Sequence, residues 1–261
     1  MAVIRDSYTM SSMKFPKQHG AWAFLIVPLL LGSLLGSGNW LGFVFALTWI
    51  AAYPVSYFGG RAFLTRVRRG AWTARARDEL RSALPWVTVT LTGAITLVAM
   101  RPWILLPGAV IAALWSVSIY LSWLGRERGI INDLLLVTLA SIAPLLMYSV
   151  ANNQHSLSLL PHSIWIAALV SLLFFVGSVL HVKALIRGVK DHRWHIASVG
   201  FHIAVVTALL LSMSSWWLAF PFTIALGRTI VMKPGLRPGK IGAIETVIAL
   251  LVVICTVTAE S

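Results

Sequence analysis

Long apolar stretches alternate with short polar or charged segments along the whole chain. A hydrocarbon layer roughly 30 Å thick is crossed by about 20 helical residues, so each apolar stretch of that length predicts a membrane span. The chain contains nine such stretches, and charged residues, Pro or Gly mark their ends. They cover about 21–37, 40–58, 84–100, 102–123, 131–151, 162–180, 196–213, 215–231 and 241–258.

This pattern predicts an all-α polytopic transmembrane bundle. We expect a polar tail over residues 1–20 and a single transmembrane helical domain over 21–258. Several predicted spans contain proline, which membrane helices tolerate because neighbouring groups re-satisfy the freed backbone carbonyls. Composition agrees with this class, since 58% of the residues are hydrophobic, 11% are charged and the mean hydropathy is +0.84.

The distribution of basic residues predicts the orientation. With the N-terminus in the cytoplasm, 20 of the 21 lysines and arginines fall on the cytoplasmic side, leaving Arg101 on the other. An excess of lysine and arginine is typical of the cytoplasmic loops of membrane proteins. We therefore expect a multi-pass protein of the cell membrane with its C-terminus on the opposite side and cytoplasmic loops at about 59–83, 124–130, 181–195 and 232–240.

The same distribution explains the net charge of +13 without a nucleic acid partner. A basic inner face already serves topology and contact with anionic lipid headgroups, so membrane lipids are the expected partners. The single cysteine, Cys255, lies in the last predicted span, which excludes a disulfide framework or a cysteine-based metal site. We predict no metal and no cofactor.

The segment FPKQHGAW places Lys17, Gln18 and His19 at the start of the first span. The N-terminus of a helix exposes unpaired N–H groups, and Gly20 would let an anion approach the backbone closely. An anion site is one interpretation. The alternative is an interfacial anchor, with the lysine reaching the headgroups and the other two side chains capping the helix.

A second polar group follows the sixth span, in HVKALIRGVKDH. Lys183 and Arg187 are four residues apart and share a helical face, and His181 lies on another. Either a lipid headgroup or a bound substrate would relieve the repulsion between the two cations. His202 and Glu245 lie inside predicted spans, where polar groups are costly, so we expect each to find a partner in the bundle.

A third group lies in GRERGIINDLLL, between the fourth and fifth spans. Asn132 and Asp133 are suited to N-cap the fifth span. Alternatively, they join a polar pocket that faces the basic groups of the other loops. Spacing alone does not separate the two interpretations.

The segment FPKQHGAWAFLIVPLLLG closely resembles the opening signature of the YwiC-like family of bacterial integral membrane proteins, and SVLHVKALIRG is similar to a later family segment. More remotely, the nine spans and the junction SIYLSWLGRERGIINDLLL resemble UbiA-type prenyltransferases. That resemblance implies a UbiA-like helix arrangement. It would also imply Asp-rich motifs after spans 2 and 6 that hold Mg²⁺.

Those motifs are missing here. The corresponding segments read YPVSYFGGRAFLTRVRR and HVKALIRGVKDH, with one aspartate, Asp191, near the second position and none in the first before Asp78. Mg²⁺ requires oxygen ligands, so a two-metal prenyl-transfer site cannot be assembled. Basic side chains stand in place of the acids, which favours direct pairing with an anionic group.

Three functions remain open. The first is binding of an anionic amphiphile, such as an isoprenoid phosphate or a phospholipid, in an inward-facing cavity, with or without catalysis. The second is a non-catalytic subunit that binds membrane-protein partners, and the third is a transporter. For the cavity we predict a ring of six side chains, with Arg75 outside it on the surface of the 59–83 loop: Lys17, His19, Arg61, Lys183, Arg187 and Arg228.

Overall fold

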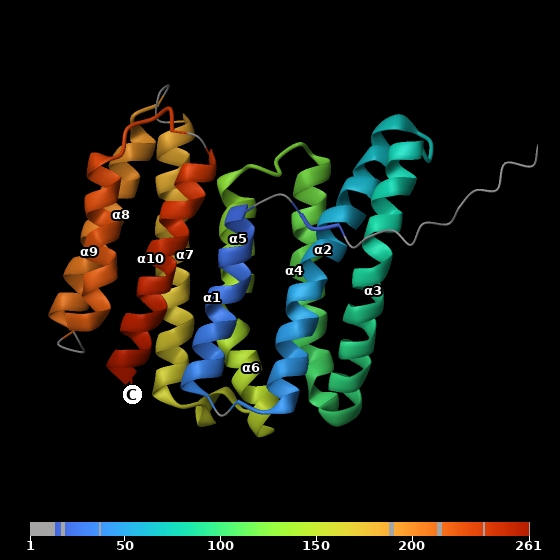
Figure 1. The fold of residues 1–261 in the computed structure, drawn as a ribbon, viewed down its shortest axis with the longest axis horizontal. Helices are drawn as coiled ribbons and strands as arrows, with labels where there is room; N and C mark the ends of the chain where they lie inside the picture. The colour runs from blue at the N-terminus through green and yellow to red at the C-terminus, as the bar shows by residue number, and fades with distance from the viewer. Residues whose placement is uncertain are drawn as a thin grey trace, which may run out of the picture.

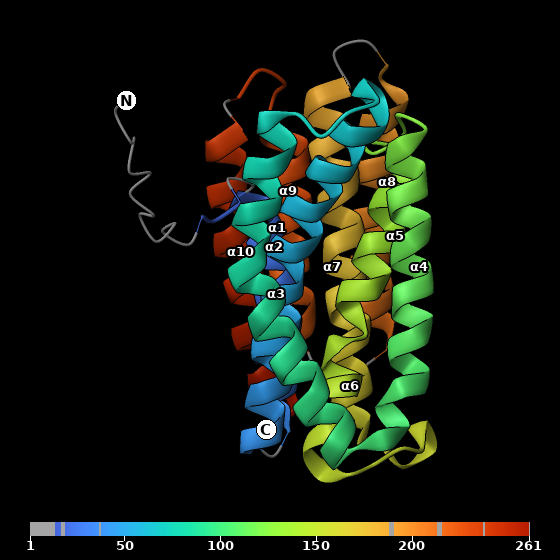
Figure 2. The same cartoon turned by 90° about the vertical axis from the view of Figure 1, so that its right-hand side faces the viewer.

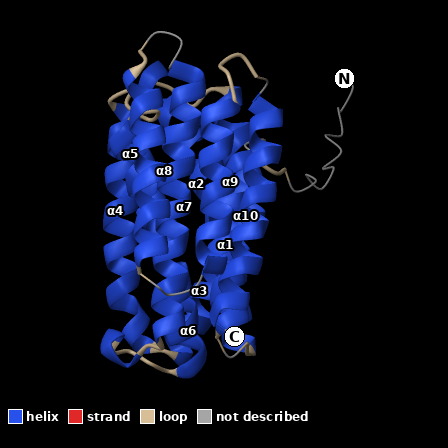
Figure 3. Cartoon of the chain, turned by 90° about the vertical axis from the view of Figure 1, so that its left-hand side faces the viewer, coloured by secondary structure: helices blue, strands red, loops and turns tan. Residues whose placement is uncertain are grey.

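The structure is a computed structural model, and it describes residues 14–16, 19–36, 38–187, 191–212, 216–236 and 238–260. Within these ranges every regular element is a helix, which confirms the all-α prediction (Figure 3). The elements are α1 (His19–Leu35), α2 (Trp40–Arg69), α3 (Ala74–Met100), η1 (Pro102–Ile104), α4 (Leu105–Trp123), α5 (Ile130–Ser141), α6 (Ala143–Asn152), η2 (Leu157–Leu159), α7 (His162–Arg187), α8 (Arg193–Leu211), α9 (Trp216–Val231) and α10 (Pro238–Glu260).

Seven helical segments of the described chain are long and apolar enough to cross a membrane, with α5 and α6 counted together. The other two, α1 and α9, are shorter apolar helices. The nine predicted stretches thus all fall on helices, and the prediction of a polytopic membrane bundle is confirmed.

The fifth predicted span is broken into two helices. Ile142 ends α5 and precedes α6, and Pro144 occupies the first turn of α6. Because proline lacks an N–H and clashes with the preceding turn, it favours a helix start over a helix interior. The span predicted over 131–151 is confirmed as the segment Ile130–Asn152, and the structure adds a break at Ile142 within it.

The helices run side by side in alternating directions (Figures 1 and 2). One end of the bundle, which we call the basic end, carries the start of α1 and the connections after α2, α4, α7 and α9 (top of Figure 1). The other end carries the last turns of α1, α3, α6, α8 and α10. Among the described lysines and arginines, Arg101 alone lies at that opposite end, where its Nε donates to the carbonyl of Val150.

The connection predicted at about 59–83 is mostly helical. Helix α2 continues to Arg69 and α3 begins at Ala74, where the side chain of Thr73 accepts from the N–H of Ala76. Gly70 ends α2 at a φ of 66°, a left-handed conformation that glycine adopts without strain. The loop is therefore reduced to residues 70–73, and α2 and α3 form one long antiparallel hairpin.

The core is centred on α7, which packs against α1, α5, α6, α8 and α10. The largest group of buried apolar side chains joins α1, α7, α9 and α10 and includes Leu31, Phe175, Phe222 and Val252. Helix α4 buries the least of its surface and presents its apolar side chains outward. In a membrane protein this outer surface meets lipid, and the buried centre must be held by close packing.

One contact between α1 and α6 depends on a glycine. A Cβ added at Gly32 would lie 2.9 Å from the Cα of Pro144. Since the obstacle is backbone, it cannot rotate away as a side chain could. We expect Gly32→Ala to lower the free energy of unfolding in mixed micelles by about 1–3 kcal/mol, a typical cost of overpacking.

Gly59→Ala is the matched control, because a Cβ at Gly59 within α2 meets nothing within 4 Å. Alanine is the better helix former, so no loss of stability is expected there. Equal stability of the two variants would contradict the proposed backbone contact.

Candidate functional site at the basic end

The structure distributes the predicted ring of cations over separate places. Lys17 and Gln18 lie outside the described residues, and of His19 only its position as the first residue of α1 is described. Arg61 lines a cavity beside α2, Lys183 and Arg187 contact the segment before α5, and Arg228 is buried between helices. The described members of the ring thus have contacts in three different places.

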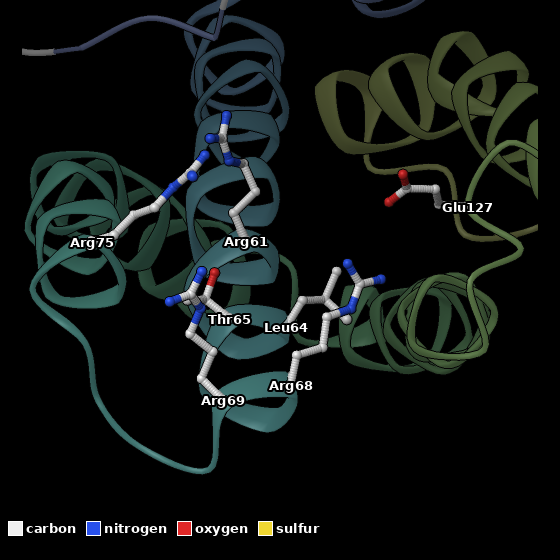
Figure 4. Close-up of a pocket in the computed structure, with 7 residues that line it drawn as sticks. All are labelled: Arg61, Leu64, Thr65, Arg68, Arg69, Arg75 and Glu127. Carbon is white, nitrogen blue, oxygen red and sulfur yellow. The ribbon is translucent and has the colours of Figure 1, made fainter.

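A cavity of about 320 Å³ lies at the basic end beside the α2–α3 hairpin. Figure 4 shows that arginines from α2 surround it, that Arg75 reaches it from the start of α3, and that Glu127 projects from the opposite side. We call this the arginine cavity. It is lined by Arg61, Leu64, Thr65, Arg68, Arg69, Arg75 and Glu127.

The arginine cavity has a net positive charge. Arg61 is paired with Glu79 at 2.8 Å, and it also donates to the Tyr57 hydroxyl at 2.6 Å. Subtracting Glu79 and Glu127 from the four arginines leaves a formal charge of +2. Arginine forks bind phosphate and carboxylate oxygens without a metal bridge. Arg75, predicted from the sequence to lie outside the anion site, is one of the residues that line this cavity.

A second polar contact joins α5 to α7. The Lys183 ammonium lies 2.5 Å from the Asp133 carboxylate and 3.0 Å from the carbonyl oxygen of Arg128. Arg187 donates to the same carbonyl at 2.8 Å. The repulsion expected between the two cations is thus relieved from within the protein, by a carboxylate and a shared carbonyl.

Asn132 and Asp133 are not N-cap residues. Helix α5 begins at Ile130 with Gly129 at the N-cap position, and no side chain caps it. The Asn132 amide donates to the carbonyl of Glu127, which holds the segment beside the arginine cavity. Of the two interpretations of this segment, the observed contacts of Asp133 agree with the one in which it faces basic groups of another element.

A third group of polar side chains is buried between α7, α9 and α10. Arg228 donates from Nη1 to Oε1 of Glu245, and the Ser178 hydroxyl donates to Oε2 of the same carboxylate. The Nε2 atom of His181 lies 4.0 Å from Glu245, too far for a hydrogen bond. We call Ser178, His181, Arg228 and Glu245 the buried cluster.

His202 lies close to this cluster on α8. Its Nδ1 atom is 2.7 Å from the carbonyl of Ser198, one helical turn earlier. Its Nε2 atom would lie 2.9 Å from a Cβ added at Gly177, so the ring packs directly against the backbone of α7. Glycine at this position therefore allows α8 to approach α7 closely.

The opening motif FPKQHGAW contributes an aromatic contact. Phe15 packs on Trp22 of α1 and on Trp86 of α3, with ring centroids 6.3 and 5.2 Å apart. The Trp86 indole donates to the carbonyl of Lys14. Trp22 also packs edge-on against Tyr53 of α2 and lines an apolar cavity of about 290 Å³ between α1 and α10. Part of this motif thus has a packing role.

Several residues of these sites were not found from the sequence. Arg68 and Arg69 were counted only as cytoplasmic charges of a loop, Glu127 was given no role, and Ser178 carried no signal on an apolar helix. The charge of Glu79 and its spacing from Arg61 across a predicted loop gave no indication of their pairing. The pairing of Glu79 with Arg61 could have been predicted only if α2 and α3 had been expected to form one hairpin.

The chemistry available at these sites is binding through charge and hydrogen bonds. Across the described part of the chain, no three His, Cys, Asp or Glu side chains are grouped so that they could hold a metal ion. Asp191, which stands near the second Asp-rich position, accepts from the backbone N–H of Arg193 at the start of α8.

Comparison with known proteins identifies a family. A family model described as YwiC-like protein matches residues 15–148. An uncharacterised protein named YwiC from Bacillus subtilis is 26% identical over 216 residues, which is 78% of this chain and 81% of the relative. An uncharacterised protein from Haemophilus influenzae is 26% identical over 234 residues, which is 87% of this chain and 90% of the relative.

No solved structure matches the chain at a significant level. The remote resemblance to UbiA-type prenyltransferases, and the helix arrangement it implies, therefore stay predictions.

The contribution of the buried ion pair between Lys183 and Asp133 to stability can be tested by substitution. Lys183 is 7% exposed, so removing its carboxylate partner leaves a largely buried ammonium with one backbone acceptor. We expect Asp133→Asn to lower the free energy of unfolding by about 1–3 kcal/mol.

Asp78→Asn is the control, because the Lys14–Asp78 pair has the same chemistry but both side chains are about half exposed or more. Exposed pairs contribute about 0–1 kcal/mol. The free energy of unfolding of both variants is measured by SDS titration. If both lost the same amount, the buried Lys183–Asp133 pair would contribute no more to stability than an exposed pair.

Proposed function

The chain belongs to the YwiC-like protein family, and we propose that it is a multi-pass membrane protein that binds the phosphate group of an anionic amphiphile in the arginine cavity. The observation that carries this proposal is the gathering of four arginines from two helices around one open cavity. An isoprenoid phosphate and a phospholipid share the required chemistry. The experiment below separates a terminal phosphate from a lipid phosphodiester.

The charge of the cavity supports a phosphate monoester. A phosphate monoester carries about −1.5 to −2 charges near neutral pH. The formal charge of +2 that remains when the charges of Glu79, which pairs with Arg61, and of Glu127, which lines the cavity, are subtracted would balance it. Thr65 adds a hydroxyl that can donate to a phosphate oxygen. A phosphodiester, with one charge, would leave the cavity positive.

The position of the cavity supports an amphiphile. It lies at one end of a bundle whose outer surface is apolar, which is the level of lipid headgroups in a membrane (Figures 1 and 4). Arg61 contacts Tyr57, whose ring lies 6.3 Å from Tyr53, and Tyr53 in turn packs against Trp22 at the apolar cavity. An aromatic row thus connects the charged site with an apolar one, as an amphiphile requires.

We also propose that the basic end faces the cytoplasm, with the N-terminus on that side and the C-terminus on the other. The excess of lysine and arginine at this end supports the orientation. Anionic lipids of the inner leaflet would then meet the arginine cavity directly.

Arg68→Gln combined with Arg69→Gln tests the phosphate site. Each basic side chain near an anionic headgroup contributes about 1 kcal/mol, so losing both should weaken binding of dioleoyl phosphatidic acid roughly 30-fold. Binding to purified protein is measured by native mass spectrometry, and it should weaken as ionic strength rises. Dioleoyl phosphatidylglycerol, a phosphodiester with the same chains, should bind less tightly than phosphatidic acid.

Arg77→Gln is the control, because Arg77 is exposed on α3 and does not line the cavity. It should bind phosphatidic acid within about twofold of the unaltered protein, since it provides only a distant, screened charge. The proposal fails if the double variant and the control weaken binding equally, or if neither does.

Cysteine labelling tests the orientation. Cys255 is buried in α10, so a Cys255→Ala background can carry one new cysteine at Arg126 near the basic end or at Gln154 at the opposite end. We expect a membrane-impermeant maleimide to label Gln154→Cys in intact cells and Arg126→Cys only after permeabilisation. The reverse result would invert the proposed topology.

A further inference from the structure

The buried cluster contains polar atoms that have no partner within the protein. Arg228 and His181 are 7% and 1% exposed, and Nε and Nη2 of Arg228 and both ring nitrogens of His181 form no hydrogen bond. Buried polar atoms are almost always hydrogen-bonded, to protein or to something bound. Each unpaired donor in an apolar setting costs roughly 1–3 kcal/mol. Four such atoms on two side chains of one cluster are therefore available to hydrogen-bond a molecule bound there.

The geometry of Arg228 shows which group could bind. Its bond to Glu245 uses Nη1, so the edge formed by Nε and Nη2 remains free. Two N–H groups on one guanidinium edge form a fork that suits oxygen acceptors. The neutral imidazole of His181 adds one donor and one acceptor. A ligand with a carbonyl or hydroxyl oxygen can satisfy these atoms.

The charge of the cluster argues against an ion. Arg228 is already balanced by Glu245, whose other oxygen accepts from Ser178. An additional anion would lie beside the carboxylate and an additional cation beside the guanidinium, in surroundings of low dielectric where an uncompensated charge is strongly unfavourable. These charges therefore favour an uncharged ligand at Arg228 over the anion predicted from the sequence.

The depth of the cluster fits the head of a membrane amphiphile. Arg228 lies three residues before the end of α9, and Glu245 lies seven residues after the start of α10. At about 1.5 Å per residue, these positions are roughly 5–10 Å inside the helix ends. In a bilayer this is the boundary between headgroups and acyl chains, below the level of lipid phosphates.

We propose that the buried cluster binds the uncharged hydroxyl or carbonyl head of a membrane amphiphile, with its oxygen held by the free edge of Arg228 and by His181. This site lies on α7, α9 and α10, whereas the arginine cavity is lined by α2, α3 and the segment before α5. The two sites are therefore separate, and this inference does not depend on the proposed phosphate site.

The experiment measures probe binding to the purified full-length chain by native mass spectrometry. The uncharged probes are dioleoylglycerol, which supplies a hydroxyl and ester carbonyls, and decylubiquinone, which supplies ring carbonyls without a hydroxyl. Dioleoyl phosphatidic acid is the anionic comparison. We expect one equivalent of an uncharged probe to bind the unaltered protein, and the probe that binds identifies which oxygen chemistry is used.

Two variants remove the ligand contacts by different means. Arg228→Lys keeps the charge opposite Glu245 but lacks the guanidinium fork. His181→Phe replaces a buried ring by an apolar ring of similar size and removes two unpaired nitrogens, so its thermal stability without probe should be equal or higher. Both should weaken binding of the uncharged probe about tenfold or more, as expected for a lost hydrogen bond to a charged group.

Ser171→Ala is the matched control. Ser171 lies two turns before Ser178 on the same face of α7 and is buried. Its hydroxyl donates to the Ala167 carbonyl of its own helix. It should bind the uncharged probe normally. If Arg228→Lys does not fold, His181→Phe decides the question.

The proposal is overturned if neither uncharged probe binds the unaltered protein, which would mean that water alone fills the cluster. It is also overturned if His181→Phe binds as the unaltered protein does, or if phosphatidic acid is the probe whose binding depends on Arg228. If instead the phosphate site proposed in the arginine cavity is wrong, phosphatidic acid binding will not change when Arg68 and Arg69 are substituted.

Discussion

Hydrocarbon offers no hydrogen bonds, and the rest of this structure follows from that constraint. Backbone groups are paired within helices, which is why the described chain contains no other regular element. Charges of the described chain lie mostly at the ends of the bundle, and those inside it are paired. The Arg228–Glu245 pair is the clearest example of the second solution, because it joins α9 and α10 where neither charge could remain alone.

The two candidate sites differ in how this constraint is met. The arginine cavity is open at the end of the bundle, where an excess of positive charge costs less than it would inside, because solvent screens it. In the buried cluster the charges of Arg228 and Glu245 cancel. Nitrogen atoms of Arg228 and His181 remain there without a hydrogen-bond partner. If both proposals hold, the two sites would separate phosphate binding from the binding of an uncharged oxygen by their different charge balance.

Much of the fold could be predicted from the sequence, because hydrophobic length and the position of basic residues follow directly from the membrane. The neighbours of each helix could not, since lipid-facing and protein-facing apolar side chains look alike. The proximity of Asp133 to Lys183 depends on α5 packing beside α7. The place of Arg75 among the residues that line the arginine cavity depends on the α2–α3 hairpin. The need of Glu245 for a partner was predictable, but its pairing with Arg228 depended on the packing of α9 against α10.

The length of α2 has a mechanical consequence. Its 30 residues measure about 45 Å, roughly 15 Å more than a typical hydrocarbon layer. Since Arg68 and Arg69 are on its last turn, a thin bilayer would leave that turn standing in water and a thick one would draw it toward the lipid surface. Membrane thickness would therefore adjust how easily the arginine cavity is reached from the bilayer.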